Sequence, residues 1–246
     1  MRELSTEQGT VRSGPLEAVF AEAARLGTAA WRGAPGGRLA WALTGGSTPK
    51  AWYRWCTANS ALTPMLLQQT DWYVSDERCV PLASEESNFG NADRLLFVPN
   101  GVPPERKHPW AVQLAPEPAL ADFTRQAAER FGSRKGFDLC FLGLGDDALT
   151  ASLFPGSALL TNDGGALFAA VAVPGRGDRL TITPSGLRAC GRIVVMATGE
   201  AKAEAVRRIF RGDESVAAVP AKVLASCAGR VVWLLDDAAA AGLGGG

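Results

Sequence analysis

The chain has 246 residues, 47% of them hydrophobic, which is enough to bury a substantial core in one large α/β domain or two small ones. Lysine plus arginine equals aspartate plus glutamate at 25 residues each, so the charge indicates neither nucleic acid nor an anionic membrane surface as a partner. The polar first residues and the lack of an apolar run of about 18 residues predict a cytoplasmic protein without a membrane-spanning segment.

Apolar runs of strand length alternate with helical patterns along the chain. Strands are expected at residues 38–46, 71–77, 137–145, 192–200 and 230–237. Helices are expected at residues 16–31, 48–57, 88–97, 117–132, 148–154 and 200–211. Nearly continuous apolar strands are typical of a parallel sheet that is covered on both faces. The sequence therefore predicts an α/β fold with a doubly wound, mostly parallel sheet flanked by helices.

Proline and glycine gather in residues 99–118 and 155–178 without a charge block or low complexity. This composition is typical of long loops within one domain rather than of a linker between two. We therefore expect a single α/β domain over residues 1–246 with flexible tails at both ends, the second of which includes the final "GLGGG".

The first predicted strand runs into "LTGGSTPKAW", which has the features of a phosphate-binding helix start. Gly45 and Gly46 permit close approach of a ligand to the backbone, and Ser47 or Thr48 can cap the helix that follows. Exposed backbone N–H groups at such a helix start bind anions well. An ordinary glycine turn with a helix cap is the alternative interpretation.

Three cationic residues stand near the ends of other predicted elements. Arg78 follows the second strand in "DER", Arg179 begins "RLTIT" after a glycine-rich loop, and Lys202 lies in the first turn after "ATGE". Ligands of open α/β sheets bind beyond the carboxyl ends of the strands, so these cations could meet one anion there. Solvated surface charges or structural ion pairs are the alternative.

The third predicted strand leads into "GLGDDALTASLFPG", residues 143–156. This segment lacks the GxGxxG pattern because Ala148 occupies its sixth position, so we expect no Rossmann-type dinucleotide cofactor. The five cysteines stand singly, and His108 is the one histidine of the sequence, so we expect no metal site.

Four blocks of the sequence carry a family resemblance: "LTGGSTP", "DWYVSDERCVPLASEESNFGNADRLL", "FDLCFLGLGDDALTASLFPG" and "ATGEAKAEAVRRI". In order and approximate spacing, over about residues 16–240, they resemble the 6-phosphogluconolactonases. The resemblance implies the sugar-isomerase-like α/β fold shared with glucosamine-6-phosphate deaminases. It also implies hydrolysis of 6-phosphogluconolactone to 6-phosphogluconate in the oxidative pentose phosphate pathway, with no metal or organic cofactor. The implied partner is a small sugar phosphate, and the oligomeric state stays open, a monomer being compatible.

The same resemblance implies which residues hold the phosphate and the sugar. These positions are Gly45, Gly46, Ser47, Arg78, Asn88, Arg179 and Lys202.

The chain departs from the family in its third block. Members typically have G-x-G-x-D-G-H-T-A-S-L-F-P, whereas this chain has Asp147 followed by Ala148 and Leu149. In the family the histidine is the expected general base, and the aspartate positions and polarises it. Asp147 is therefore the retained catalytic position, while leucine cannot accept a proton.

Other residues could take over the role of the base. Asp147, or Asp76 and Glu77 at the second strand end, could activate water if burial raised a carboxyl pKa toward neutrality. His108 could act if its long loop folded back over the site. The non-catalytic interpretation of Asp147 is an N-cap for a helix that begins near Ala148.

Three functions follow from these observations. The first is a 6-phosphogluconolactonase whose hydrolysis is slowed by the loss of the histidine. The second is a noncatalytic or regulatory sugar-phosphate-binding protein, since the binding positions persist without the base. The third, an isomerase or deaminase of the related branch, is weaker because that chemistry commonly employs the same histidine.

Overall fold

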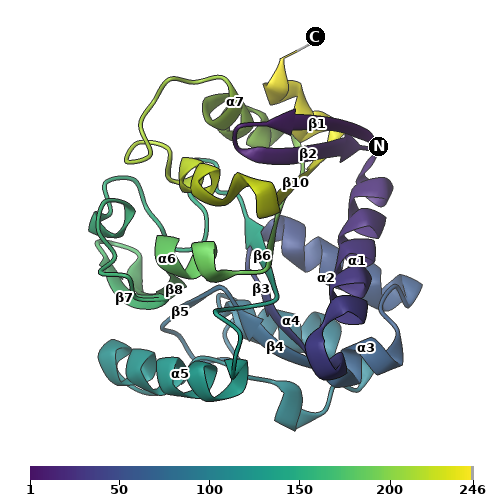
Figure 1. Cartoon of the computed structure of the whole chain (residues 1–246), viewed down its shortest axis with the longest axis vertical. Helices are drawn as coiled ribbons and strands as arrows, with labels where there is room; N and C mark the ends of the chain where they lie inside the picture. Colours follow the sequence, from purple (N-terminus) through teal and green to yellow (C-terminus); the bar gives the residue numbers. More distant parts are fainter. Residues whose placement is uncertain (245–246) are drawn as a thin grey trace.

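A seven-stranded sheet forms the centre of the molecule (Figure 1). The computed structural model describes residues 1–244. The strands lie in the order β1-β2-β10-β9-β6-β3-β4, and every neighbouring pair is parallel except β1 with β2. Their bounds are Arg2–Thr6 (β1), Gly9–Gly14 (β2), Leu39–Leu43 (β3), Thr70–Val74 (β4), Leu139–Gly143 (β6), Arg192–Ala197 (β9) and Val231–Asp236 (β10). The predicted mostly parallel sheet is confirmed.

A second, antiparallel sheet follows the carboxyl end of β4. It contains β5 (Asp76–Arg78), β8 (Gly177–Ile182) and β7 (Phe168–Val173) in that order. Ser75 joins the two sheets, because its N–H donates to Leu43 O at 2.7 Å and its carbonyl accepts from Ile182 N at 2.8 Å. The prediction of a continuous loop over residues 155–178 is wrong, since β7 lies within it. The proline and glycine residues around β7 favoured the prediction of a loop. The strand itself consists mostly of small side chains, and pairing with β8 stabilises it.

Helices cover both sides of the large sheet. In Figure 1, α1 and α2 lie on one side and α6 lies on the other. The bounds are Leu16–Gly33 (α1), Ser47–Asn59 (α2), Pro64–Gln69 (α3), Asn88–Ala92 (α4), Pro116–Phe131 (α5), Pro184–Ala189 (α6), Ala203–Phe210 (α7) and Asp237–Ala240 (α8). Further helical turns span Asp93–Phe97, Glu200–Lys202 and Pro220–Arg230. The short helices α3 and α6 were not expected from the sequence.

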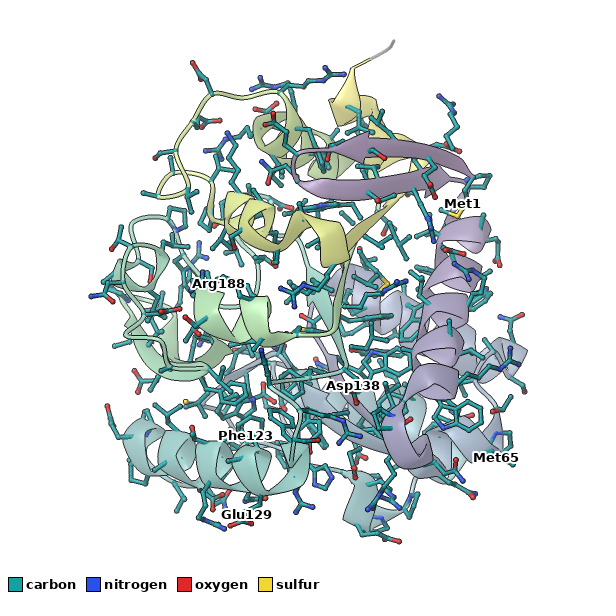
Figure 2. The ribbon with its side chains drawn as sticks, in the orientation of Figure 1. Met1, Met65, Phe123, Glu129, Asp138 and Arg188 are labelled. Atoms are coloured by element: carbon teal, nitrogen blue, oxygen red, sulfur yellow. The ribbon has the colours of Figure 1, made fainter. Side chains whose placement is uncertain are left out.

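The interior is rich in aromatic side chains. Trp41 on β3 stacks on Trp72 of β4 with ring centroids 5.0 Å apart and meets the edge of Phe141 on β6 at 4.9 Å. Figure 2 shows Phe123 on the inner side of α5 and Glu129 on its outer side. Phe123 stacks against Trp110 with a centroid separation of 3.6 Å, so α5 closes the core below the small sheet.

Both predictions of flexible tails need correction. Residues 2–14 form the β1–β2 hairpin, in which β2 pairs with β10 and Val11 is buried. Backbone pairing holds this hairpin, and it has too few apolar residues to show the alternating pattern that predicts a strand. At the other end, Ala241–Leu243 form a helical turn, and Arg211 Nε donates to Leu243 O at 2.7 Å. Residues 245–246 of the predicted tail lie outside the described residues.

The predicted helix at residues 148–154 is wrong. Ala148 and Ala151 have φ values of 59° and 49°, and left-handed residues interrupt a right-handed helix. The segment is a compact loop in which Gly145 N donates to Leu149 O at 2.9 Å and Ala221 N donates to Ala148 O at 3.0 Å. Asp147 is consequently not a helix N-cap.

Close packing of α1 on β3 generates a stability prediction. A Cβ added at Gly27 would overlap the buried ring of Trp41, whereas one added at Gly33 would meet no atom within 4 Å. We expect Gly27→Ala to lower the free energy of unfolding by about 1–3 kcal/mol through overpacking. Gly33→Ala should be neutral or stabilising by up to about 1 kcal/mol because alanine favours helix. Urea unfolding midpoints measure both, and equal effects would contradict the packing.

Candidate functional site

The principal cavity lies beyond the carboxyl ends of the parallel strands and has a volume of about 560 Å³. Residues after β3, β6 and β9 line it, together with β5 and β8 of the small sheet. The eight site residues predicted from the sequence all line this cavity: Gly45, Gly46, Ser47, Arg78, Asn88, Asp147, Arg179 and Lys202. Leu149 lines it as well. The cavity is thus at the edge of the sheet where open α/β proteins bind ligands.

The amino end of α2 forms one wall. Gly46 is the N-cap residue with φ of 108°, a conformation that favours glycine, and no side chain among the described residues caps the helix. The expected capping by Ser47 or Thr48 is therefore wrong; the Thr48 hydroxyl instead bonds the Thr198 hydroxyl at 2.8 Å. The first N–H groups of α2 remain available to a ligand.

Asn88 fixes the glycine turn in front of that helix. Its side-chain Nδ2 donates to Asp76 O at 2.8 Å, and a Cβ at Gly45 would overlap its Oδ1. Glycine is required at position 45 because the Asn88 amide occupies the place of a side chain. Asn88 therefore connects the turn after β3 with the strand β5.

Two arginines from neighbouring strands of the small sheet line the cavity. Arg78 on β5 and Arg179 on β8 are directly opposite in the antiparallel ladder. Burial, together with the neighbouring charge of Arg78, lowers the pKa of Arg179. Like charges directly opposite across a ladder destabilise it, and an anion between them would relieve the repulsion. The pairing of the two strands thus brings two guanidinium groups to the lining of one cavity.

The loop after β6 presents two carboxylates, each with a cationic partner. Lys202 Nζ donates to Asp146 Oδ1 at 2.6 Å, and Arg176 Nη1 lies 3.8 Å from Asp147 Oδ2. Asp147 Oδ1 also accepts from Leu149 N at 3.4 Å. Leu149 lines the cavity beside these carboxylates, and its side chain has no atom that can accept a proton.

Asp76 and Glu77 are adjacent in sequence but have different surroundings. Glu77 is fully buried and accepts from the backbone N–H groups of Arg78, Asn88 and Phe89 and from the Ser87 hydroxyl, at 2.7–3.0 Å. Burial raises the pKa of Glu77, but its acceptor sites are filled and it does not line the cavity. Asp76 does line the cavity. Of these two candidate bases, only Asp76 can reach a ligand.

His108 lies at the opposite end of β4. Its backbone N–H donates to Trp72 O at 2.9 Å, and its Nε2 lies 3.0 Å from Asp71 Oδ1. Because Asp71 is at the amino end of β4 and the cavity is at the carboxyl end, the histidine cannot act on a ligand there. The hypothesis that its loop folds back over the site is wrong.

Sequence reasoning missed several residues of the cavity. Arg176 comes from the turn between β7 and β8, and its guanidinium lies 5.5 Å from the centroid of the Phe154 ring, in a cation–π contact. Ser152 contributes a hydroxyl that bonds Asp76. The glycine-flanked "PGRG" turn was a possible signal for Arg176, since such turns often carry binding residues.

Comparison with known proteins assigns the family. The family model described as glucosamine-6-phosphate isomerases/6-phosphogluconolactonase matches residues 16–233. The chain belongs to this family. A 6-phosphogluconolactonase from Rattus norvegicus is 32% identical over 209 residues, which are 83% of this chain and 80% of the rat protein. A 6-phosphogluconolactonase of Synechocystis sp. is 33% identical over 203 residues, 80% of this chain and 82% of that relative.

Solved structures show the same fold. The 6-phosphogluconolactonase from Trypanosoma cruzi superposes with a TM-score of 0.83 at 23% identity, covering 100% of both chains. A monomeric glucosamine-6-phosphate deaminase superposes with a TM-score of 0.77 at 19% identity, covering 94% of this chain and 98% of its own. The sugar-isomerase-like α/β fold expected from the sequence is confirmed.

The buried carboxylate of Glu77 generates a prediction. Glu77→Gln replaces one acceptor oxygen by an NH₂ group that faces backbone donors, so we expect the free energy of unfolding to fall by about 1–3 kcal/mol. The matched control is Asp146→Asn, whose side chain is 75% exposed. It should change stability by less than about 0.5 kcal/mol. Denaturant unfolding of both variants tests this, and a stable Glu77→Gln protein would contradict it.

Proposed function

We propose that this protein hydrolyses 6-phospho-D-glucono-1,5-lactone to 6-phosphogluconate, the reaction of the oxidative pentose phosphate pathway. The observation that carries the proposal is the opposed pair Arg78 and Arg179, which lies beside the uncapped amino end of α2 in a cavity of about 560 Å³. The named activity of the relatives, 6-phosphogluconolactonase, fits this arrangement.

In this proposal the substrate's phosphate lies between the two arginines and the backbone of Gly45, Gly46 and Ser47. Charge-assisted hydrogen bonds from guanidinium groups and helix N–H groups suit a phosphate dianion. Asn88 supports this wall through its contacts with Gly45 and β5. Lys202, which bonds Asp146 at 2.6 Å, binds the sugar from the other side of the cavity.

The lactone carbonyl would then point toward the loop that carries Asp147 and Leu149. Asp147 takes the catalytic position that the family resemblance implies, but its expected histidine partner is replaced by Leu149. We infer a hydrolase that is slower than its relatives. A positioned general base contributes about 10²- to 10⁴-fold in rate, which bounds the loss.

The alternatives make different experimental predictions. A noncatalytic binding protein would bind 6-phosphogluconate without accelerating lactone hydrolysis above a spontaneous blank. A deaminase would release ammonia from glucosamine 6-phosphate. Acid release from freshly generated lactone, with the blank subtracted, separates these three functions.

A cytoplasmic location is also part of the proposal. Within residues 1–244, no helix has both the length and the apolar character needed to cross a membrane. We infer that the protein acts on a small sugar phosphate, without nucleic acid or membrane as a partner, and a monomer is compatible with this role.

Restoring the histidine should increase the rate. We expect Leu149→His combined with Ala148→Gly to raise lactonase kcat by about 10²-fold or more, because the new imidazole can accept the proton of water. The second change removes the strain of alanine at φ of 59° and so lets the imidazole reach its position. The matched control is Leu149→Gln with Ala148→Gly, which adds a polar group without a base. Equal rates for the two double variants would contradict the proposed role of position 149.

Removing an arginine should weaken binding. We expect Arg179→Gln to raise the Kd for 6-phosphogluconate by about 10- to 100-fold, since a charge-assisted hydrogen bond contributes about 1.5–3 kcal/mol. Arg125 on α5, whose side chain is 60% exposed, provides the control Arg125→Gln. Titration calorimetry measures both, and unchanged affinity of Arg179→Gln would refute the phosphate position.

A further inference from the structure

Three carboxylates among residues 1–244 line the cavity, and they differ in their neighbours. Asp146 is 75% exposed and is bonded by Lys202 at 2.6 Å. Asp147 is 40% exposed and lies 3.8 Å from a guanidinium nitrogen of Arg176. Asp76 is only 8% exposed and bonds hydroxyl groups instead. Of these three carboxylates, Asp76 is therefore the one without an ion pair to a lysine or arginine among the described residues.

The position of Asp76 is rigidly fixed. Its Oδ2 accepts from Ser152 Oγ at 2.8 Å, and its Oδ1 accepts from Ser75 Oγ at 3.3 Å. Its backbone is held by β-pairing with Thr181 and by the side chain of Asn88. Thr181 Oγ1 also accepts from Ser152 N at 3.1 Å, so the same strand fixes the serine that orients the carboxylate. A preorganised carboxylate at a cavity wall is the arrangement that base catalysis requires.

The loop that lost the histidine contributes to this wall. Ser152 is three residues after Leu149, and both side chains line the cavity together with Asp76. A water molecule between the substrate carbonyl and this wall would have Asp76 as its acceptor, because Leu149 offers none.

We propose that Asp76 is the general base that activates water in this chain, an inference that rests on the proposed lactonase function. The carboxylate removes a proton from water as the water oxygen bonds to C1 of the lactone. The tetrahedral intermediate then collapses with cleavage of the bond between C1 and the ring oxygen. The ring oxygen takes the proton from Asp76 and becomes a hydroxyl, and the new carboxylic acid ionises in solution.

The electrostatic surroundings support this role. Burial raises the pKa of Asp76 above that of an ordinary aspartate, which makes the carboxylate a stronger base. The hydroxyls of Ser152 and Ser75 and the charges of Arg78 and Arg179 act in the opposite direction and keep it ionisable. Asp76 in turn affects two buried neighbours: burial and, to a smaller extent, the charge of Asp76 raise the pKa of Tyr53 of α2, and the Cys190 hydrogen bond, burial and the charge of Asp76 raise the pKa of Cys140 of β6. Catalysis should therefore decline as the pH falls through a value above about 3.9, the ordinary aspartate pKa.

The test is Asp76→Asn in two backgrounds, the parent and the Leu149→His, Ala148→Gly double variant. In the parent we expect kcat for the lactone to fall by about 10²-fold or more, while the Kd for 6-phosphogluconate does not rise, because the substitution removes a negative charge near the product carboxylate. In the double variant the same substitution should cost less than about tenfold, because the new histidine supplies the base. Asparagine keeps the shape of aspartate, and near-ultraviolet circular dichroism with ligand binding verifies folding.

A second variant separates base catalysis from a structural role. Ser152→Ala removes a hydrogen bond to the charged carboxylate, so the acid limb of the kcat–pH profile should move to higher pH. An unmoved limb, retained kcat in Asp76→Asn, or equal losses in both backgrounds would overturn the assignment of Asp76. If the parent itself does not exceed the spontaneous blank, the proposed lactonase function fails, and the role of Asp76 fails with it.

Discussion

The buried carboxylate of Glu77 holds together the two walls of the cavity. It accepts hydrogen bonds from the backbone of Asn88 and Phe89, which fixes the start of α4 against β5. Asn88, held in this way, packs against Gly45 and donates to the carbonyl of Asp76. Through these contacts one buried carboxylate fixes the glycine turn before α2 and the backbone of Asp76, which lines the cavity. Such a charge is tolerated because several donors replace its water.

The small antiparallel sheet gives the cavity its positive charge. Pairing of β5 with β8 places Arg78 opposite Arg179, an arrangement that costs stability in the absence of an anion. The β7–β8 hairpin carries Arg176 at its turn, where Gly175 and Gly177 have φ values of 71° and 73°. The small sheet and its β7–β8 turn thus contribute three arginines to the lining of the cavity.

The chemistry at the other end of the cavity depends on a loop rather than on a helix. Ala148 is buried with φ of 59°, so the loop keeps a conformation that glycine adopts more easily. The loop still delivers Asp147, Leu149 and Ser152 to the cavity. Leu149 provides no proton acceptor, whereas Asp147 and Ser152 of the same loop place polar side chains at the cavity. Ser152 of this loop also donates a hydrogen bond to the carboxylate of Asp76 and so orients it.

Sequence reasoning predicted the parallel sheet and selected eight candidate site residues that line one cavity, because both predictions depend on local patterns. Continuous apolar runs marked β3 and β6, and glycine turns at strand ends marked the helix start after Gly46. It missed the β1–β2 hairpin and β7, which depend on backbone pairing with distant strands rather than on apolar periodicity. A helix was expected at residues 148–154 because the sequence does not reveal that Ala148 and Ala151 adopt the left-handed conformation. Only the structure shows that Asp76 lines the cavity and Glu77 does not, since neighbouring side chains in a strand point to opposite sides.

A crystal structure of the protein with 6-phosphogluconate would test the central claim most directly, because it places both ends of the ligand. The account predicts phosphate oxygens within hydrogen-bonding distance of Arg78, Arg179 and the first N–H groups of α2. It also predicts that the C1 carboxylate lies against the wall formed by Asp76, Leu149 and Ser152. A phosphate bound away from both arginines, or a C1 carboxylate out of reach of Asp76, would contradict it.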